Sequence, residues 1–410
     1  MQKGKMVPEI RFKGFEGKWV EYELGSLYSF LKGSNLSQDS FYYSNDKKAI
    51  AYGHLYTIYG PVINAVHLSS NEKTSLISKK NDLLFPGSST VPLGTAQANA
   101  IMLNGVKLGG DIICARPIKD NVDSQFVSYQ INAQKYKLFP IISGTTISHM
   151  YASGLKNTKW KFTTLDEQST ISDFFNNLLI LIQSQELKLK KLNEVKQSLL
   201  NKMFASENQK FPEIRFKGFT EEWIKEKIKE LAIFRRGSFP QPYGEEKWYS
   251  GSGAMPFVQV ADIGNALSLN KKTNQLISKI AMPFSVFVPK DSVIVTLQGT
   301  IGRVALTNYD CFIDRTILYF NSYRKLLNKI LFAILIKNKF EQEALLAPGA
   351  VIKTITKQKL NNFELFIPNF NEQQKIGQFF SNLDSLIRSQ ELKLEKLNNI
   401  KQALLEKMFC

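Results

Sequence analysis

The side chains that most often perform catalysis are few and scattered in this chain of 410 residues. Three histidines and three cysteines leave little material for a metal centre, and no CxxC pair offers a zinc or iron–sulfur site. The acids Asp291, Asp310 and Asp314 do not form a nuclease cluster around a lysine. No GxxxxGK[ST] loop and no HExxH motif occurs. We therefore expect a chain without catalytic residues, without a metal and without a cofactor of its own.

The charge balance indicates a polyanionic partner. Lysine and arginine number 53 against 36 aspartates and glutamates, which gives a net charge of +17. A surplus of this size favours nucleic acid as the partner, although a basic surface kept for solubility is the alternative. No apolar run approaches the ~18 residues of a membrane span. The widely separated cysteines fit a reducing compartment, so we expect a cytoplasmic protein that does not enter a membrane.

The chain contains two copies of one sequence pattern. The segment EIRFKGF begins at Glu9 and again at Glu213, and a tryptophan follows each copy. The segment SQELKL begins at Ser184 and again at Ser389, and residues on both sides keep this offset of 205. Between these blocks the similarity collapses. The pattern predicts a repeated framework that carries two dissimilar modules, each large enough to hold its own core.

The blocks at the end of each copy predict two long helices, at 171–204 and 376–409. Both segments lack proline and are rich in leucine, lysine, glutamate and glutamine, which are good helix formers. Apolar residues recur at alternating steps of four and three, which is typical of a coiled-coil seam. The predicted seam residues are Leu178, Ile182, Leu189, Leu192, Leu199, Met203, Leu383, Ile387, Leu394, Leu397, Leu404 and Met408.

Four polar residues interrupt the seam, namely Gln185, Lys196, Gln390 and Lys401. They either fix the register of the helices or lie at a wet edge, and the sequence leaves both interpretations open. A leucine seam needs a partner helix. We expect each helix to pair with the other copy in the same chain, with an intermolecular coiled coil as the alternative.

These patterns together predict an α+β fold with a pseudo-twofold internal repeat. Two mixed, strand-rich α/β modules are joined by two long helices that form an antiparallel coiled coil. Short apolar or β-branched runs after turn residues, at 82–85 and 291–296, indicate strands within the modules. The expected boundaries are 8–165 for the first module, 166–206 for the first helix, 212–370 for the second module and 371–410 for the second helix.

The order of module, helix, module and helix resembles the specificity subunit of a type I restriction-modification system. The resemblance covers nearly the whole chain. It rests on the PEIRFKGF openings at Pro8 and Pro212, on the sequences 166–168 and 371–373 before the helices, and on QELKL…KLN…KQ…LL…KMF in both helices. It implies that 8–165 and 212–370 are target-recognition domains. Each would read one half of a split double-stranded DNA sequence, and the helices would set the gap.

The resemblance also implies partners and chemistry outside this chain. Two methyltransferase subunits and motor-nuclease subunits would assemble on the repeated framework. The complex would methylate adenine with S-adenosylmethionine, or translocate DNA with ATP and Mg and then cut it. This chain itself would be a non-catalytic DNA-specificity subunit. The alternative is a non-catalytic coiled-coil adaptor with sequence-independent DNA-binding end modules.

The resemblance directs the search for DNA-binding residues to three turns in each module. They lie at 32–34, 88–90 and 143–149 in the first module, and at 235–238, 298–303 and 349–354 in the second. Glutamine has the geometry to read adenine and arginine to read guanine, whereas Lys353 is expected on a phosphate. The expected DNA-binding residues are Lys32, Ser34, Ser88, Ser89, Thr90, Thr145, Thr146, Ser148, Arg235, Arg236, Ser238, Gln298, Thr300, Arg303, Lys353 and Thr354.

An aromatic group in the first module admits two interpretations. Tyr52, His54, Tyr56 and Tyr59 lie close together in the sequence, near two lysines. They either stack on sugars or bases of a nucleic acid or form part of a packed core, and packing is the favoured interpretation.

Overall fold

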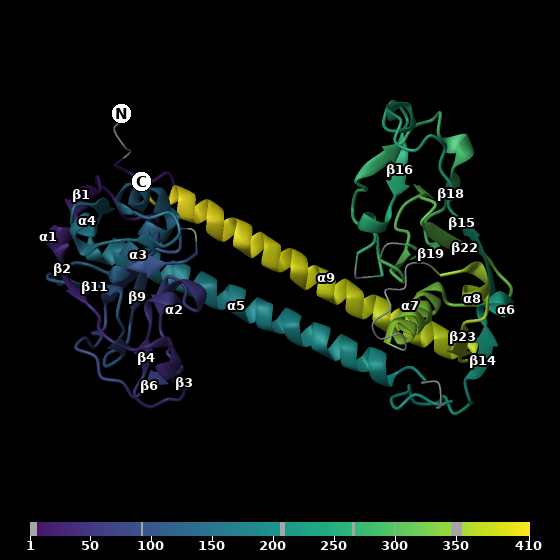
Figure 1. The fold of residues 1–410 in the computed structure, drawn as a ribbon, viewed down its shortest axis with the longest axis horizontal. Helices are drawn as coiled ribbons and strands as arrows, with labels where there is room; N and C mark the ends of the chain where they lie inside the picture. The colour runs from purple at the N-terminus through teal and green to yellow at the C-terminus, as the bar shows by residue number, and fades with distance from the viewer. Residues whose placement is uncertain (1–5, 92, 206–209, 265–266, 299, 346–354) are drawn as a thin grey trace. The chain divides into compact units, whose positions relative to one another are not determined.

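The computed structural model describes residues 6–91, 93–205, 210–264, 267–298, 300–345 and 355–410, and the chain forms two compact units. The first unit contains Met1–Lys188 and Glu391–Cys410, and the second contains Leu189–Gln390. The division falls inside two long helices, α5 (Leu165–Lys202) and α9 (Phe370–Lys407). Each unit therefore combines one module with the start of its own helix and the end of the other helix (Figure 1).

A five-stranded sheet organises the first module, in the order β2-β11-β7-β9-β5. All neighbours are antiparallel except β5 and β9, which run parallel. The central strand β7 is buried along its whole length because apolar clusters cover both faces, which explains the apolar run at 83–86 that follows Asp82. The strands are β2 (Tyr28–Lys32), β5 (Val62–Ile63), β7 (Asp82–Pro86), β9 (Asn99–Ile101) and β11 (Ile112–Pro117).

The second module repeats the order of three of these strands where the sequence similarity is lost. Its antiparallel sheet runs β15-β22-β19-β20, so that β15, β22 and β19 take the places of β2, β11 and β7. A second sheet, β17-β16-β21-β18, completes the module. The strands are β15 (Ala232–Arg236), β16 (Met255–Val258), β17 (Gln275–Ile277), β18 (Val286–Val288), β19 (Val293–Thr296), β20 (Val304–Leu306), β21 (Cys311–Ile313) and β22 (Ile317–Tyr323).

Helices occur at equivalent places in both modules. The apolar helix α7 starts 205 positions after α3, and each packs its buried residues into the core of its own module. The equivalent pairs are α1 (Leu24–Leu27) with α6 (Ile228–Leu231), α3 (Ser124–Ala133) with α7 (Lys329–Leu345), and α4 (Ala152–Lys156) with α8 (Lys357–Asn361). The first module also has α2 (Tyr52–Thr57) and the short pairs β3 (Phe41–Tyr43) with β6 (Leu68–Ser70), β4 (Ala49–Ile50) with β10 (Lys107–Leu108), and β8 (Ser88–Ser89) with β12 (Ser148–His149).

A buried ion pair explains why the EIRFKGF opening recurs with a glutamate at the helix start. In the first unit, Arg11 Nε donates to Glu167 Oε1 at 2.7 Å. In the second unit, Arg215 Nε donates to Glu372 Oε1 at 2.7 Å. In both pairs a second nitrogen of the arginine binds the other carboxylate oxygen, and both glutamates are fully buried. The pair therefore ties the opening of each module to the start of its helix.

Two further repeated features join each module to its helix. The backbone of β1 (Val20–Glu23) pairs antiparallel with β13 (Lys159–Phe162), and β14 (Ile224–Lys227) pairs likewise with β23 (Glu364–Ile367). A glutamine follows each buried glutamate. Gln168 Oε1 accepts a hydrogen bond from Asp123 N, just before α3, and Gln373 Oε1 accepts one from Asn328 N, just before α7. The repeated motifs thus encode one structural junction, built twice.

The end of each helix completes the core of the module that it does not follow. Phe409, after α9, packs edge-on against Trp19 in the first unit, with ring centroids 6.4 Å apart. Phe204, after α5, packs edge-on against Trp223 in the second unit at 6.2 Å. The phenylalanine of each KMF sequence therefore makes the same contact with a repeated tryptophan, once in each unit.

The predicted seam is confirmed as an antiparallel coiled coil within the chain (Figure 1). Every predicted seam residue is buried or half-buried, and the start of one helix packs against the end of the other in each unit. Lys196 Nζ contacts Asp384 Oδ1 at 2.5 Å. The Oε1 atoms of Gln185 and Gln390 are buried and find no hydrogen-bond partner among the described residues, which argues against a wet edge at these two positions.

Within the described residues, no helix combines the length and apolar character that crossing a membrane requires. The same part of the chain holds no group of three or more histidine, cysteine, aspartate or glutamate side chains placed to bind a metal ion.

Candidate nucleic-acid interface

Two of the three predicted turns of the first module meet at Asp111, just before β11, and the third turn pairs with one of them. Lys32 Nζ, at the end of β2, lies 3.5 Å from Asp111 Oδ1. Ser88 Oγ, in β8, donates to Asp111 Oδ2 at 3.0 Å. β8 in turn pairs with β12, where Ser148 lies opposite Ser89. From the sequence we expect Asp111 only to hold a turn, and its contacts with the other predicted turns are not foreseen because the residues that it joins are up to 79 positions away in the chain.

The residues of these turns differ in how far they reach solvent. Thr90, Thr145 and Thr146 are exposed, and the Lys32 side chain is 73% exposed. Ser88 and Ser89 are buried, and Ser89 receives a hydrogen bond from Ser148 on its backbone oxygen. The exposed threonines and Lys32 are therefore available to a ligand as they stand. The two buried serines stay predictions as DNA contacts, and in the structure they hold β8 and β12 together.

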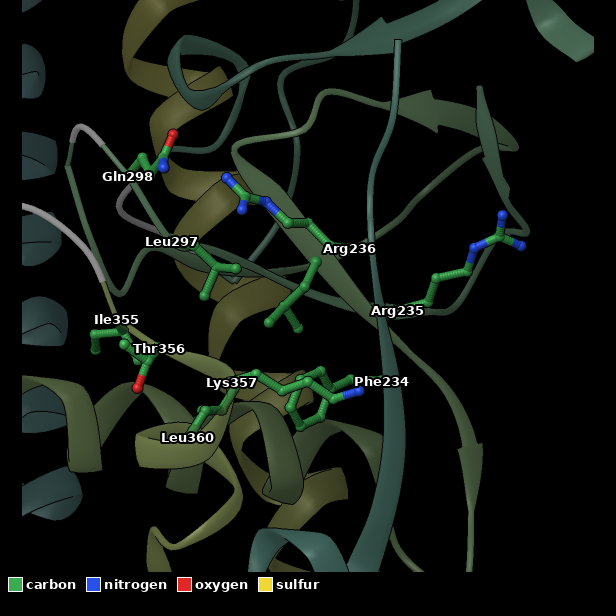
Figure 2. Close-up of a pocket in the computed structure, with 10 residues that line it drawn as sticks. Phe234, Arg235, Arg236, Leu297, Gln298, Ile355, Thr356, Lys357 and Leu360 are labelled. Carbon is green, nitrogen blue, oxygen red and sulfur yellow. The ribbon is translucent and has the colours of Figure 1, made fainter. Parts of the chain in front are cut away.

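Three predicted residues of the second module line one pocket of about 480 Å³. Arg235 and Arg236 come from the end of β15, and Gln298 follows β19. Figure 2 shows the Arg236 guanidinium directed toward Gln298, above a floor that includes Leu297. The remaining lining residues are Phe234, Leu318, Ile355, Thr356, Lys357 and Leu360. The fold thus brings the first and second predicted turns together, with Arg236 and Gln298 over an apolar hollow and the Arg235 guanidinium directed away from them (Figure 2).

The other predicted residues of this module are placed differently. Thr300 is exposed. Arg303 is half-buried and donates through Nη1 to the backbone oxygen of Ile263 at 3.0 Å. Ser238 Oγ donates to a backbone oxygen within the module, as Ser34 Oγ bonds within the first. Lys353 and Thr354 lie outside the described residues.

Sequence reasoning also missed Arg315, in the turn between β21 and β22. Arg315 is exposed, and its backbone oxygen accepts a hydrogen bond from Arg236 Nε. Its guanidinium carbon lies 5.3 Å from the ring centroid of Tyr243. The turn begins with Asp314, one of the three acids that form no nuclease cluster in the sequence. Alignment of the two modules by strand order, rather than by sequence identity, is the signal that would have found it.

The aromatic group of the first module belongs to the packing of that module. Tyr52 and Tyr59 pack against a buried apolar cluster around Leu55. The His54 ring packs edge-on against Phe41, with centroids 4.7 Å apart, and burial lowers the pKa of His54 below its ordinary value. Burial raises the pKa of Tyr59, because it disfavours the charged form of both side chains. These contacts favour the core interpretation over stacking on bases.

Comparison with known proteins places both halves of the chain in one family model. The model, a type I restriction modification DNA specificity domain, matches residues 16–197 and again residues 220–399. The chain is 24% identical over 312 residues to a putative type I restriction enzyme MjaX specificity subunit from Methanocaldococcus jannaschii, covering 72% of this chain and 70% of that protein. It is 20% identical over 291 residues to the type I restriction enzyme EcoBI specificity subunit from Escherichia coli, covering 65% of this chain and 61% of that protein, less than two-thirds of its length.

Solved structures share the fold at low sequence identity. A type I restriction-modification system S subunit from M. genitalium superposes with a TM-score of 0.65 at 13% identity, over 99% of each chain. A chain from a structural study of complex assembly in a type I R-M system gives a TM-score of 0.54 at 17% identity, over 95% of this chain and 97% of that one. The arrangement of two modules and two long helices is therefore a known fold.

Proposed function

The chain belongs to the family of type I restriction-modification DNA specificity proteins, and from that premise we propose that its two modules each read one half of a split double-stranded DNA target. It is a specificity subunit with two DNA-recognition domains, and the enzymatic activities of such systems belong to other subunits.

The observation that carries the proposal is one strand framework presenting two different sets of polar side chains. β2-β11-β7 and β15-β22-β19 share their order, yet the first ends in Lys32 where the second ends in Arg235 and Arg236. A repeated scaffold with different exposed donors suits two half-sites of different sequence, because base edges are distinguished by their donor and acceptor pattern. The net charge of +17 supplies the attraction to phosphates.

The two helices suit the role of a spacer between half-sites. Each has 38 residues, or roughly 57 Å at about 1.5 Å per residue. Half-sites one turn of B-DNA apart are ~34–36 Å from each other. Each helix starts in the core of one unit and ends in the core of the other, and packed aromatic residues hold both its start and its end. A fixed spacer predicts a gap of constant length.

Exposed apolar residues on both helices support a scaffolding role for two methyltransferase subunits. They occur at equivalent positions of the repeat, which gives two copies of one surface for two copies of one partner. The pairs are Leu181 with Leu386, Leu187 with Leu392, and Val195 with Ile400, all between 38% and 53% exposed. Motor-nuclease subunits would join this core, and S-adenosylmethionine, ATP and Mg would serve those partner subunits.

Paired substitutions test the scaffolding role. Leu187→Glu with Leu392→Glu places a charge in both copies of the exposed apolar surface, and we expect the methyltransferase to be lost from the purified complex. Lys188→Glu with Lys393→Glu changes the charge at the neighbouring exposed positions and serves as the matched control. Retention of both methyltransferase subunits by the leucine variant would contradict the proposed surface.

Salt dependence tests the reading of DNA by the full chain. Fluorescence anisotropy on a labelled duplex that contains the target should show affinity falling on the order of 10³-fold or more between 50 and 200 mM salt, as expected for six or more phosphate contacts. The second candidate function, an adaptor with sequence-independent DNA binding, gives the same salt slope but binds an unrelated duplex equally well. Affinity that does not change with salt contradicts both.

A further inference from the structure

We propose that Arg315 is a specificity-determining residue of the second module and reads a guanine in its half-site. The inference rests on the proposed function, since it names a base-reading group within the same DNA interface. It starts from a turn of three residues, Asp314 to Thr316, between β21 and β22. This turn lies beside the end of β15, where Arg236 is located.

The backbone of the turn is fixed by its contact with β15. Gly237 N donates to Ile317 O at 2.8 Å. A Cβ on Gly237 would lie 2.2 Å from the backbone oxygen of Asp314, so no larger residue fits there without a shift of the backbone. Asp314 N donates to Val258 O at 3.0 Å, which anchors the other side of the turn. The Cα position of Arg315 is therefore set by three strands.

Asp314 organises the turn and does not neutralise Arg315. Its side chain is buried, and Oδ1 accepts hydrogen bonds from Thr316 N at 2.8 Å and from Thr316 Oγ1 at 2.7 Å. Oδ2 accepts a hydrogen bond from the Tyr243 hydroxyl at 3.1 Å. Burial and the neighbouring Asp314 raise the pKa of Tyr243 to about 12, so the phenol keeps the proton that it donates. The carboxylate is thus occupied by neutral donors.

Tyr243 in turn positions the Arg315 guanidinium. The guanidinium carbon lies 5.3 Å from the centroid of the Tyr243 ring, a cation–π contact. Gln259 Nε2 donates to the Tyr243 hydroxyl at 3.0 Å, which fixes the ring from its far end. Among the described residues, no carboxylate pairs with Arg315. Its N–H groups are therefore free for an external acceptor, and guanine offers O6 and N7 in the spacing that an arginine fork fits.

The first module has a different residue at the position equivalent to Arg315. Gly33 N donates to Ile112 O at 2.9 Å, just as Gly237 N donates to Ile317 O. Two residues before the accepting isoleucine, the first module has Gly110 and the second module has Arg315. The same backbone junction therefore carries a cation over a tyrosine in one module and no side chain in the other. Two modules that read different half-sites would differ at such a position.

The test is selection from a random duplex pool, using the full chain co-expressed with its methyltransferase partner. Arg315→Gly gives the second module the residue that the first has at this turn, and Arg315→Lys keeps the charge but removes the fork. We expect Arg315→Gly to lose one guanine from one half-site of the consensus and to bind the wild-type target about 10-fold or more weakly, and Arg315→Lys to weaken the preference for that guanine. Arg324→Ala removes a charge from the opposite, exposed end of β22 and should leave the consensus unchanged.

Each outcome decides the inference. An unchanged consensus for both Arg315 variants would overturn it, even if affinity falls uniformly, because a uniform loss is the mark of a phosphate contact. Loss of a base other than guanine in Arg315→Gly would also overturn it, since the arginine fork fits O6 and N7 of guanine. A wild-type pool without any consensus would overturn the proposed function, and the inference would fall with it.

Discussion

The buried ion pair between Arg215 and Glu372 gives the sharpest test of how the repeated framework is held together. Arg215→Met removes the cation and leaves the Glu372 carboxylate, which is fully buried and otherwise binds two guanidinium nitrogens at 2.7 Å. Stranding a buried charge in this way costs about 3–5 kcal/mol. The carboxylate also raises the pKa of Arg215, chiefly through their hydrogen bond, so the guanidinium keeps its charge.

Hydrogen–deuterium exchange of the full chain measures this loss in each unit separately. A cost of about 3–5 kcal/mol corresponds to roughly 100- to 4,000-fold faster exchange of the β14 and β23 amides. The double variant Arg215→Met with Glu372→Leu replaces the pair by apolar groups and should recover at least about 2 kcal/mol. Arg11→Met makes the equivalent change in the first unit and should speed the exchange of the β1 and β13 amides instead.

Two results would refute this reasoning. The first is a loss of less than about 1 kcal/mol in Arg215→Met, which would equal the value of an ordinary exposed ion pair. The second is a double variant that exchanges as fast as the single variant, because the cost would then come from lost packing of the arginine stem and not from the stranded carboxylate.

Three further predictions concern the seam, the junction of β15 with its neighbouring turn, and the aromatic packing. Gln185→Leu with Gln390→Leu removes two buried oxygens that lack partners among the described residues, and should raise the free energy of urea unfolding by about 1–3 kcal/mol; a lower value would mean that these oxygens are satisfied. Gly237→Ala places a Cβ 2.2 Å from a backbone oxygen and should cost about 1–3 kcal/mol, whereas Gly60→Ala meets no atom within 4 Å and should be neutral; equal melting temperatures would contradict this. Burial lowers the pKa of His54, so the folded chain binds its proton less readily than the unfolded chain. Stability should therefore fall as the pH drops below about 6.5, the unfolded value, and His54→Asn, which cannot titrate, should show a smaller fall.

The framework could be predicted from the sequence because its signals are local or exactly repeated in register. The seam from Leu178 to Met203 needs only the spacing of apolar residues along one helix. EIRFKGF recurs at an offset of 204 and KMF at an offset of 205, which marked them as parts of the same repeat. The sequence did not reveal which residues contact each other, since Arg11 of the first EIRFKGF segment binds Glu167, 156 positions away.

The module interiors were predicted less well, and the reason is physical. Several strands are only two to four residues long, too short for a periodic pattern to identify them. Their pairing is set by hydrogen bonds between distant residues, as between Gly237 and Ile317. The same long-range pairing buried Ser88 and Ser89, which look like an accessible turn in the sequence, and placed Arg315 beside Arg236. Residue type and turn position indicated Arg235, Arg236 and Gln298, but only the strand order indicated Arg315.

Selection of binding sites by the wild-type chain with its methyltransferase partner tests the central claim most directly. Bound duplexes from a random pool should share two short defined blocks, different in sequence and separated by an undefined gap of constant length. Two identical blocks would contradict the reading of different half-sites by different modules. A single block, a gap of variable length, or tight binding without any shared sequence would contradict the account of two recognition domains held apart by a fixed helical spacer.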